Sequence, residues 1–250
     1  MPSVNSIYYD RHGAGKPILF IHPPGMGLVT FNLQLPLSNK YQVIRMDLPG
    51  NGNSIPPFNK ITIPLLANSV IPVLNELKLE EVVICGYSNG GSIALEFALQ
   101  YPERTAGIIL IGGFPEVNSF LLQQEFQLGI LTVKLGGLPL LAKVLGFAHG
   151  TTPDYKKEIE QYVLKSHPGS LYDMYVEGLK YTCTNRLYQI KSPLLLIYGA
   201  KDYYVHHYQY LFKERIKNTE VVYVSKSRHQ IPTKHAAELN AIIHSFMDKV

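Results

Sequence analysis

The sequence predicts an α/β fold with a mostly parallel central sheet flanked by helices. The first observation behind this prediction is that short apolar runs alternate with longer segments of helical character. The second is that the runs are apolar almost throughout, which is typical of strands that helices bury on both faces. The third is a long interval, residues 114–190, that holds helix-like stretches and no convincing strand.

The expected strands are spaced so that a helix fits between most of them. They span residues 17–22, 42–47, 82–87, 107–113, 193–199 and 220–225. The expected helices of the core span residues 64–78, 89–101, 206–218 and 233–248. Pro64 suits the first turn of its helix, whereas Pro72 lacks the N–H that a helix interior needs and should kink or interrupt it.

The interval 114–190 should carry structure of its own, because structureless loops of that length are uncommon inside compact domains. Its helix-like stretches span about 116–132, 138–146, 153–166 and 170–182. We therefore expect a core formed by residues 1–113 and 191–250. Residues 114–190 would be inserted as a helical cap, or lid, over one end of the sheet.

The composition excludes several classes of protein. Of the 250 residues, 46% are hydrophobic, and the net charge of +4 is too diffuse to indicate a nucleic-acid partner. The chain shows neither a signal-peptide pattern nor the roughly 18 to 20 apolar residues of a membrane span, so we expect a cytoplasmic protein. Cys85 and Cys183 cannot form a metal-binding cysteine cluster, and we expect neither a metal nor another cofactor. The oligomeric state has no signature in the sequence.

The stretch Gly86-Tyr87-Ser88-Asn89-Gly90 stands where an apolar run passes directly into an amphipathic segment. Open α/β sheets place their ligands at the carboxyl ends of the strands. Gly-x-Ser-x-Gly at such a point permits the strained strand-to-helix turn called a nucleophile elbow, with a serine hydroxyl at its tip. The Asn89 N–H, at the start of the helix, would then donate to an oxyanion. The alternative is a glycine-rich turn with a capping serine.

A serine nucleophile needs a general base, and that base needs a carboxylate to orient it. Asp202 follows the apolar run 193–199, and His229 follows the next run, 220–225. Both would lie at the same edge of a parallel sheet as Ser88. The order Ser, Asp, His along the chain is the one expected in α/β-hydrolases. We therefore predict Ser88, Asp202 and His229 as a catalytic triad.

The chain resembles the α/β-hydrolase-fold superfamily, in the form of a serine hydrolase with a helical cap. The resemblance runs from about residue 7 to the C-terminus and is carried by "ILFIHPPGMG", "RMDLPGNGNS", "GYSNGGS" and the pair Asp202 and His229. It implies hydrolytic chemistry but does not select the substrate, because members include esterases, lactonases, C–C bond hydrolases, haloperoxidases and dehalogenases. A serine nucleophile disfavours the dehalogenases, whose elbows carry aspartate.

The first of these motifs departs from the family pattern. The usual sequence is His-Gly-x, in which the residue after glycine donates an oxyanion N–H, whereas here the run is His22-Pro23-Pro24-Gly25. Pro24 has no N–H to donate. We therefore expect a shifted loop in which the backbone of Gly25 or Met26 completes the oxyanion hole with Asn89.

Several conspicuous residues have simpler interpretations. His22 is expected to orient the oxyanion loop, and Asp47 to pin the Gly-Asn turn that follows it. His206 and His207 are expected to face solvent at the start of a helix, and His235 to be structural inside the last helix. The segment 12–17 lacks the Gly-Lys-Ser/Thr of a phosphate loop and suggests a hairpin turn. Cys85 is expected to be an inert core residue.

The cap segment is rich in leucine and phenylalanine and offers no basic cluster for a polyanionic substrate. We therefore expect an apolar pocket over Ser88 and a small-to-medium hydrophobic ester or lactone as substrate. Two other interpretations use the same pocket. One is C–C bond hydrolysis or perhydrolysis, and the other is a ligand-sensing or regulatory role.

Overall fold

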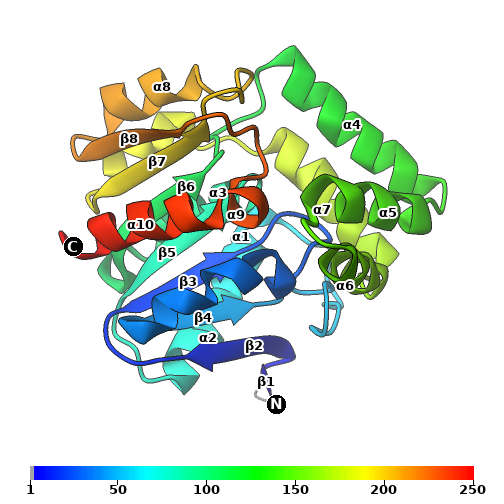
Figure 1. Ribbon diagram of the computed structural model, residues 1–250, viewed down its shortest axis with the longest axis horizontal. Helices are drawn as coiled ribbons and strands as arrows, with labels where there is room; N and C mark the ends of the chain where they lie inside the picture. The colour runs from blue at the N-terminus through cyan, green and yellow to red at the C-terminus, as the bar shows by residue number, and fades with distance from the viewer. Residues whose placement is uncertain (1–2) are drawn as a thin grey trace.

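The computed structural model describes residues 3–250 and shows an eight-stranded sheet with helices on both faces (Figure 1). The strand order is β1-β2-β4-β3-β5-β6-β7-β8. All pairings from β4 to β8 are parallel, while β1 and β2 are antiparallel additions at one edge. The strands are β1 (Ser3–Val4), β2 (Ile7–His12), β3 (Pro17–Ile21), β4 (Gln42–Met46), β5 (Val82–Tyr87), β6 (Thr105–Ile111), β7 (Leu194–Gly199) and β8 (Thr219–Val224). The predicted fold class is confirmed.

The central strands are continuous apolar runs because both of their faces are covered. Every residue of β5 and of β7 is buried. β2 has no such run and was not predicted. Its residues alternate between buried and partly exposed, as in an antiparallel strand with one solvated face near the edge of a sheet. β2 pairs with β4 and not with β3, so the predicted hairpin turn at 12–17 is wrong: this segment is a connection that passes β4.

Helices cover the two faces of the sheet and form two separate apolar clusters. One cluster joins the sheet to α1 (Ile63–Asn68), α2 (Val70–Glu76), α3 (Gly90–Gln100) and α8 (Tyr208–Arg215). The other joins it to the 3₁₀ segment η1 (Leu28–Asn39) and to α10 (Ala236–Met247), which lie in front of the sheet in Figure 1. Short elements η2 (Pro102–Arg104), η3 (Thr184–Gln189) and α9 (Ile231–Lys234) link the rest.

The helix expected over 64–78 is interrupted at Ser69, which separates α1 from α2. Pro72 lies in the first turn of α2, where its missing N–H is tolerated, so the chain breaks before the proline rather than at it. The predicted last helix is likewise divided, into α9 and α10. His235 lies at that junction and not inside a helix.

The chain between β6 and β7 forms helices α4 (Phe120–Lys134), α5 (Leu138–His149), α6 (Pro153–Leu164) and α7 (Pro168–Lys180). We call them the cap helices; in Figure 1 they lie together on the right, beyond one end of the sheet. Glu116 forms a bridge with Thr182, and Cys183 N–H donates to the Pro115 carbonyl over 3.0 Å. These contacts close the base of the insertion into a neck. The division into a core of 1–113 and 191–250 and a cap of 114–190 stays a prediction, and residues 1 and 2 of that core lie outside the described residues.

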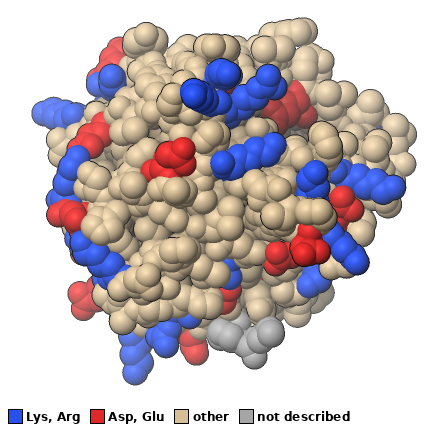
Figure 2. Space-filling view, in the orientation of Figure 1, with Lys and Arg blue, Asp and Glu red and all other residues tan. Residues whose placement is uncertain are grey.

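Within residues 3–250, no helix is both long and apolar enough to cross a membrane. The same part of the chain holds no cluster of three or more His, Cys, Asp or Glu side chains suited to a metal ion. On the face shown in Figure 2, basic and acidic side chains are interspersed rather than gathered by sign.

Candidate active site

Ser88 stands at the tip of a strained turn between β5 and α3. Its φ is +53°, a left-handed backbone conformation that residues other than glycine rarely adopt. Two hydrogen bonds hold it there: the Ser88 N–H donates to the Ile111 carbonyl over 2.8 Å, and the Gly91 N–H donates to the Ser88 carbonyl over 2.8 Å. Strain of this kind at a strand end is the geometry of a nucleophile elbow.

The glycines of this turn are required by close backbone approach. A Cβ at Gly86 would come within 2.4 Å of the Gly90 carbonyl oxygen. A Cβ at Gly90 would come within 2.4 Å of the carbonyl oxygen of Ile21, at the end of β3. The spacing of glycines in the sequence therefore reports the crowding of this turn, which allows α3 to start directly beside the sheet.

Asp202 and His229 lie in the loops that follow β7 and β8, and the structure brings them together. The His229 Nδ1 is 2.7 Å from Asp202 Oδ2, and both side chains are buried. The two loops are joined by a backbone hydrogen bond of 2.8 Å from Lys201 N–H to the Ser227 carbonyl. Because the carboxylate accepts the Nδ1–H, the Nε2 of neutral His229 is the basic nitrogen.

Ser88 and His229 line the same pocket. Within the part of the chain that the structure describes, His229 Nε2 is buried and has no hydrogen-bond partner, so it is unengaged. Burial by itself lowers the pKa of His229, but the hydrogen bond and charge of Asp202, with the charge of Glu125, outweigh it and raise the pKa above its ordinary value. Such a histidine can accept a serine proton and hold it as a stabilised imidazolium.

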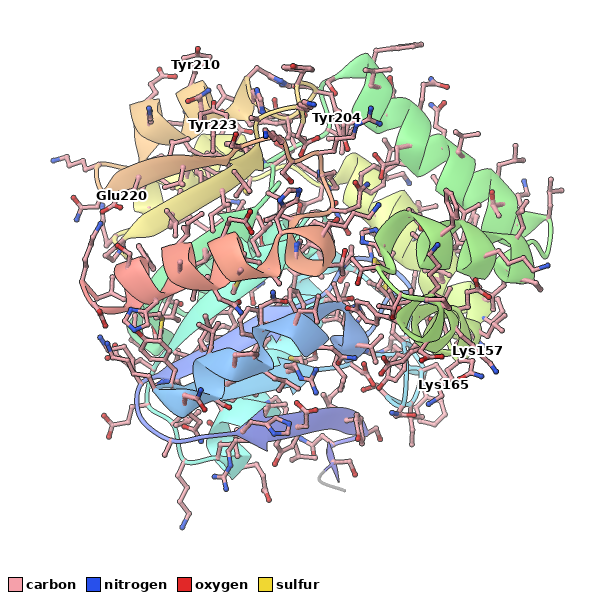
Figure 3. The ribbon with its side chains drawn as sticks, viewed as in Figure 1. Lys157, Lys165, Tyr204, Tyr210, Glu220 and Tyr223 are labelled. Atoms are coloured by element: carbon pink, nitrogen blue, oxygen red, sulfur yellow. The ribbon has the colours of Figure 1, made fainter. Side chains whose placement is uncertain are left out.

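The Tyr204 ring packs 5.8 Å from the His229 ring, between centroids, and fixes the imidazole from the loop after β7. Figure 3 labels Tyr204 at the part of that loop nearest the start of α4. Gly112, at the end of β6, leaves room on the other side, since a Cβ there would lie 2.7 Å from His229 Cε1. Sequence reasoning missed Gly112, although the glycine pair that ends the run 107–113 was a visible signal.

The pocket is a small cavity of about 70 Å³ between the sheet and the cap helices. The core contributes Pro23, Pro24, Met26, Tyr87, Ser88, Asn89 and His229, and the cap helices contribute Glu125, Phe126, Leu145, His149 and Tyr175. A larger groove of about 530 Å³ lies between η1 and α10 and contains none of the predicted site residues. The chemistry therefore points to the smaller cavity.

Of the expected oxyanion donors, Asn89 is open and Gly25 is not. Within the described residues, the Asn89 N–H makes no hydrogen bond. The Gly25 N–H instead donates to the buried Asn51 Oδ1 over 2.9 Å, and Gly25 does not line the pocket, so the structure argues against Gly25 as a donor. The Met26 N–H closes a turn onto the Pro23 carbonyl over a longer 3.3 Å, and Met26 does line the pocket. Met26 remains our prediction for the second donor.

His22 orients this loop as expected. Its Nε2 accepts from the Leu48 N–H over 2.9 Å, so its Nδ1–H donates to the Pro23 carbonyl over 2.8 Å. Burial lowers the pKa of His22 to about 4, so the ring is neutral and serves as a structural bridge.

Asp47 also has the structural role expected of it, and its hydrogen bonds extend beyond the turn that follows it. It accepts from the N–H groups of Asn53 and Leu28 and, over 2.9 Å, from the Tyr162 hydroxyl of α6. Burial raises its pKa to about 6 despite these hydrogen bonds. Lys165, labelled at the end of α6 in Figure 3, lies with its Nζ 4.7 Å from the centre of the Tyr162 ring. Asp47 therefore ties the oxyanion loop to the cap helices.

Sequence reasoning missed two polar residues of the cap helices, Glu125 and His149. His149 is buried, and its ring meets the Tyr87 ring edge-on at 5.9 Å. Burial, with the charges of His229 and Lys234, lowers the pKa of His149 to about 3, so it is neutral. No motif flags these residues, because only the packing of the cap against the sheet brings them to the pocket.

The remaining histidines and Cys85 lie outside the pocket. His206 does not face solvent as expected: it is half-buried, with Nε2 2.8 Å from the Gly199 carbonyl oxygen. His207 lies 2.8 Å from Asn118 Oδ1, and the helix begins only at Tyr208. Cys85 is buried, and burial raises the pKa of its thiol, in line with an inert core residue.

Comparison with known proteins identifies the family and the fold. The profile of a family described as the alpha/beta hydrolase fold matches residues 16–235. Pimeloyl-(acyl-carrier protein) methyl ester esterase of Aeromonas hydrophila is 26% identical over 271 residues, covering 97% of this chain and 99% of that protein. An uncharacterised protein of Mycobacterium bovis is 32% identical over 151 residues, covering 56% of this chain and only 44% of that relative.

Solved structures show the same fold at low sequence identity. The enol-lactonase of Burkholderia xenovorans matches with a TM-score of 0.84 at 20% identity, covering 98% of both chains. An esterase of Exiguobacterium antarcticum matches with a TM-score of 0.86 at 20% identity, covering 97% of this chain and 95% of that one.

Proposed function

This chain belongs to the alpha/beta hydrolase fold family, and from that premise we propose that it is a serine hydrolase that cleaves a small carboxylic ester or lactone through an acyl-enzyme. One observation carries the proposal. Ser88, on its strained turn, lines the same cavity as His229, whose other ring nitrogen is held by Asp202. The esterase and lactonase names of the similar proteins support the same class of reaction.

In the proposed reaction, Ser88 Oγ attacks the carbonyl carbon while His229 Nε2 takes the hydroxyl proton. Asp202 keeps the imidazole in the correct tautomer and stabilises the imidazolium. The tetrahedral intermediate collapses, and His229 returns the proton to the leaving alcohol, which leaves an ester on Ser88. Water, deprotonated by His229, attacks this acyl-enzyme, and the proton returns to Ser88 as the acid departs.

The oxyanion would bind first to the Asn89 N–H, which lies free at the start of α3. We propose that the Met26 N–H supplies the second donor when the substrate breaks its 3.3 Å contact with Pro23. Glycine at 25 and 27 flanks Met26, with φ of +82° and +66°, and gives the peptide groups there more freedom than other residues would.

The cavity supports a small acyl group. Its volume of about 70 Å³ is well below the roughly 300 to 1,000 Å³ of pockets for drug-sized ligands. A long acyl chain would require the cap helices to move away from the sheet. We therefore propose a substrate at the short end of the range expected from the sequence.

The test combines active-site labelling with a substrate series. A fluorophosphonate should label Ser88 stoichiometrically at neutral pH, and hydrolysis of p-nitrophenyl esters should be fastest for acetate or propionate and decline with longer chains. Ser88→Ala should abolish both. Ser92→Ala is a matched control, because Ser92 lies four residues further on, in α3, with its hydroxyl on the Phe114 carbonyl over 3.3 Å. Folded protein that is not labelled at Ser88 would refute the proposal.

A ligand-sensing role is the second candidate, because the Gly25 and Met26 N–H groups are already engaged, the first by Asn51 and the second by Pro23. It predicts slow turnover and tight retention of product, which single-turnover kinetics would detect. C–C bond hydrolysis and perhydrolysis would use the same residues, and adding a diketone or hydrogen peroxide to the assay would reveal them.

A further inference from the structure

The side chain of Asn89 has no partner for its polar atoms. Asn89 is 2% exposed, and in residues 3–250 neither Nδ2 nor Oδ1 makes a hydrogen bond. The amide lies against the cap helix α7, where a Cβ at Gly178 would come within 2.6 Å of Nδ2. Asn89 also lines the cavity that contains Ser88 and His229.

The amide is not explained by a structural role. α3 starts at Gly90, and the Asn89 side chain makes no capping hydrogen bond to it. Buried amide groups are nearly always paired, because an unpaired donor or acceptor loses its hydrogen bonds to water without replacement. A group that enters the cavity is therefore the natural partner of this side chain.

The position of Asn89 limits where that group lies on a substrate. Its backbone N–H is the proposed oxyanion donor. Its side chain is short, so the amide group lies close to that N–H. A partner of the amide would therefore sit on a carbon close to the reacting carbonyl. The walls next to the amide include Phe126, Leu145 and Tyr175, which are aromatic or aliphatic and favour apolar substituents.

A hydroxyl is the group that matches both atoms of the amide. It can accept from Nδ2–H and donate to Oδ1, whereas a methyl group of similar size would displace water and leave both unpaired. Sites built to bind a hydroxyl discriminate strongly against analogues that lack it.

We propose that the Asn89 side chain forms a polar subsite, and that the substrate is a short ester or lactone with a hydroxyl on the carbon α or β to the reacting carbonyl. This inference rests on the proposed serine hydrolase activity. It adds to the apolar pocket expected from the sequence a polar position next to the proposed nucleophile, besides the polar cap residues Glu125 and His149.

The test uses two esters that differ only in this group, methyl 3-hydroxybutanoate and methyl 3-methylbutanoate, with release of acid followed by titration at constant pH. For the faster enantiomer, the wild-type kcat/KM should favour the hydroxy ester by about tenfold or more. Asn89→Leu, of similar volume, should reduce that ratio to about one or invert it. Gln127→Leu, an exposed amide of α4, is the matched control and should leave the ratio unchanged.

Equal kcat/KM for the two esters in the wild-type protein would overturn the subsite and leave the serine mechanism standing. Absence of fluorophosphonate labelling at Ser88 would instead overturn the proposed function. If neither methyl ester is cleaved, calorimetric binding of 3-hydroxybutanamide and 3-methylbutanamide decides the question. Tighter binding of the hydroxy compound, lost in Asn89→Leu, supports the subsite, and equal or reversed affinities contradict it.

Discussion

Two turns meet at the carboxyl ends of β3 and β5, and they differ in whether their backbone N–H groups are free or hydrogen-bonded. The turn at Ser88 is strained and leaves the Asn89 N–H open. The neighbouring loop directs the Gly25 N–H to Asn51 and the Met26 N–H to Pro23. The two turns touch, since a Cβ at Gly90 would collide with the Ile21 carbonyl. One half of the proposed oxyanion site is therefore preformed, and the other half would form only when a substrate displaces an internal hydrogen bond.

This difference follows from the residues of each turn. Close packing of the backbone around Gly86 and Gly90 holds the elbow in one conformation. In the loop, Pro24 removes the amide at the usual donor position, and glycine on both sides of Met26 permits reorientation of the peptide groups. We infer that the proposed nucleophile, Ser88, is already positioned in the free protein, whereas full stabilisation of an oxyanion would depend on the loop.

The largest effect should come from Asp202, which holds the imidazole of the proposed general base, His229. Asp202→Asn should lower kcat for p-nitrophenyl acetate by about 10⁴, because the amide favours the wrong tautomer of His229. Circular dichroism should show an unchanged fold. Asp154→Asn, in the first turn of α6, is the control and should keep the wild-type rate. A rate near wild type for Asp202→Asn would show that His229 is oriented by another group.

The next effect tests the loop. Met26→Pro removes the proposed donor N–H and should lower kcat by about 10² to 10³. Met26→Leu keeps the N–H and most of the side-chain volume, and it should stay within about threefold of wild type. Proline also restricts Gly25, so the thermal midpoint of both variants must be measured. An unchanged kcat for a folded Met26→Pro protein would mean that the loop supplies no donor there.

A smaller effect should follow from releasing the loop. Asn51→Leu removes the acceptor of the Gly25 N–H, and we expect the free energy of unfolding to fall by about 1 to 3 kcal/mol, because this buried N–H loses its partner. The kcat should change by less than about tenfold, since Gly25 does not line the pocket. Urea unfolding and steady-state kinetics measure the two quantities. A loss of kcat as large as that of Met26→Pro would instead show that the contact between Asn51 and Gly25 is needed to position the loop for catalysis.

The smallest effect concerns pH. His229 must be neutral to accept the Ser88 proton, and its pKa lies above the ordinary value of 6.5, so kcat/KM should rise with pH through that higher pKa. Glu125→Gln removes a negative charge that stabilises the imidazolium. The apparent pKa should therefore fall, by a small amount because Glu125 is exposed, and activity should extend to lower pH. Glu81→Gln, at the opposite end of β5, should leave the profile unchanged, and a rise in the apparent pKa with Glu125→Gln would contradict the assignment.

The sequence was sufficient to predict the parallel core and the pairing of Asp202 with His229. Buried parallel strands and glycine-dependent turns leave local patterns, and parallel strands bring their carboxyl ends to one edge. The bond from Gly25 to Asn51 was not predictable, because it joins two loops through their tertiary packing. Glu125 and His149 were missed for the same reason, since helical periodicity does not say which part of the sheet a cap helix covers.

The neck formed by Glu116 and Thr182 has a consequence for how this chain can change over time. The bridge between Glu116 and Thr182 brings the two ends of the cap segment together, and the chain then runs through η3 back to the start of β7, which pairs in parallel with β6. The entropy of closing a loop grows only slowly with its length, by about 0.6 kcal/mol for each doubling. Ser88, Asp202 and His229 all come from outside the insertion. We therefore propose that the cap helices are an exchangeable module: shortened, lengthened or swapped helices could be inserted above the neck and select a different substrate without altering the register of the strands that present the proposed triad.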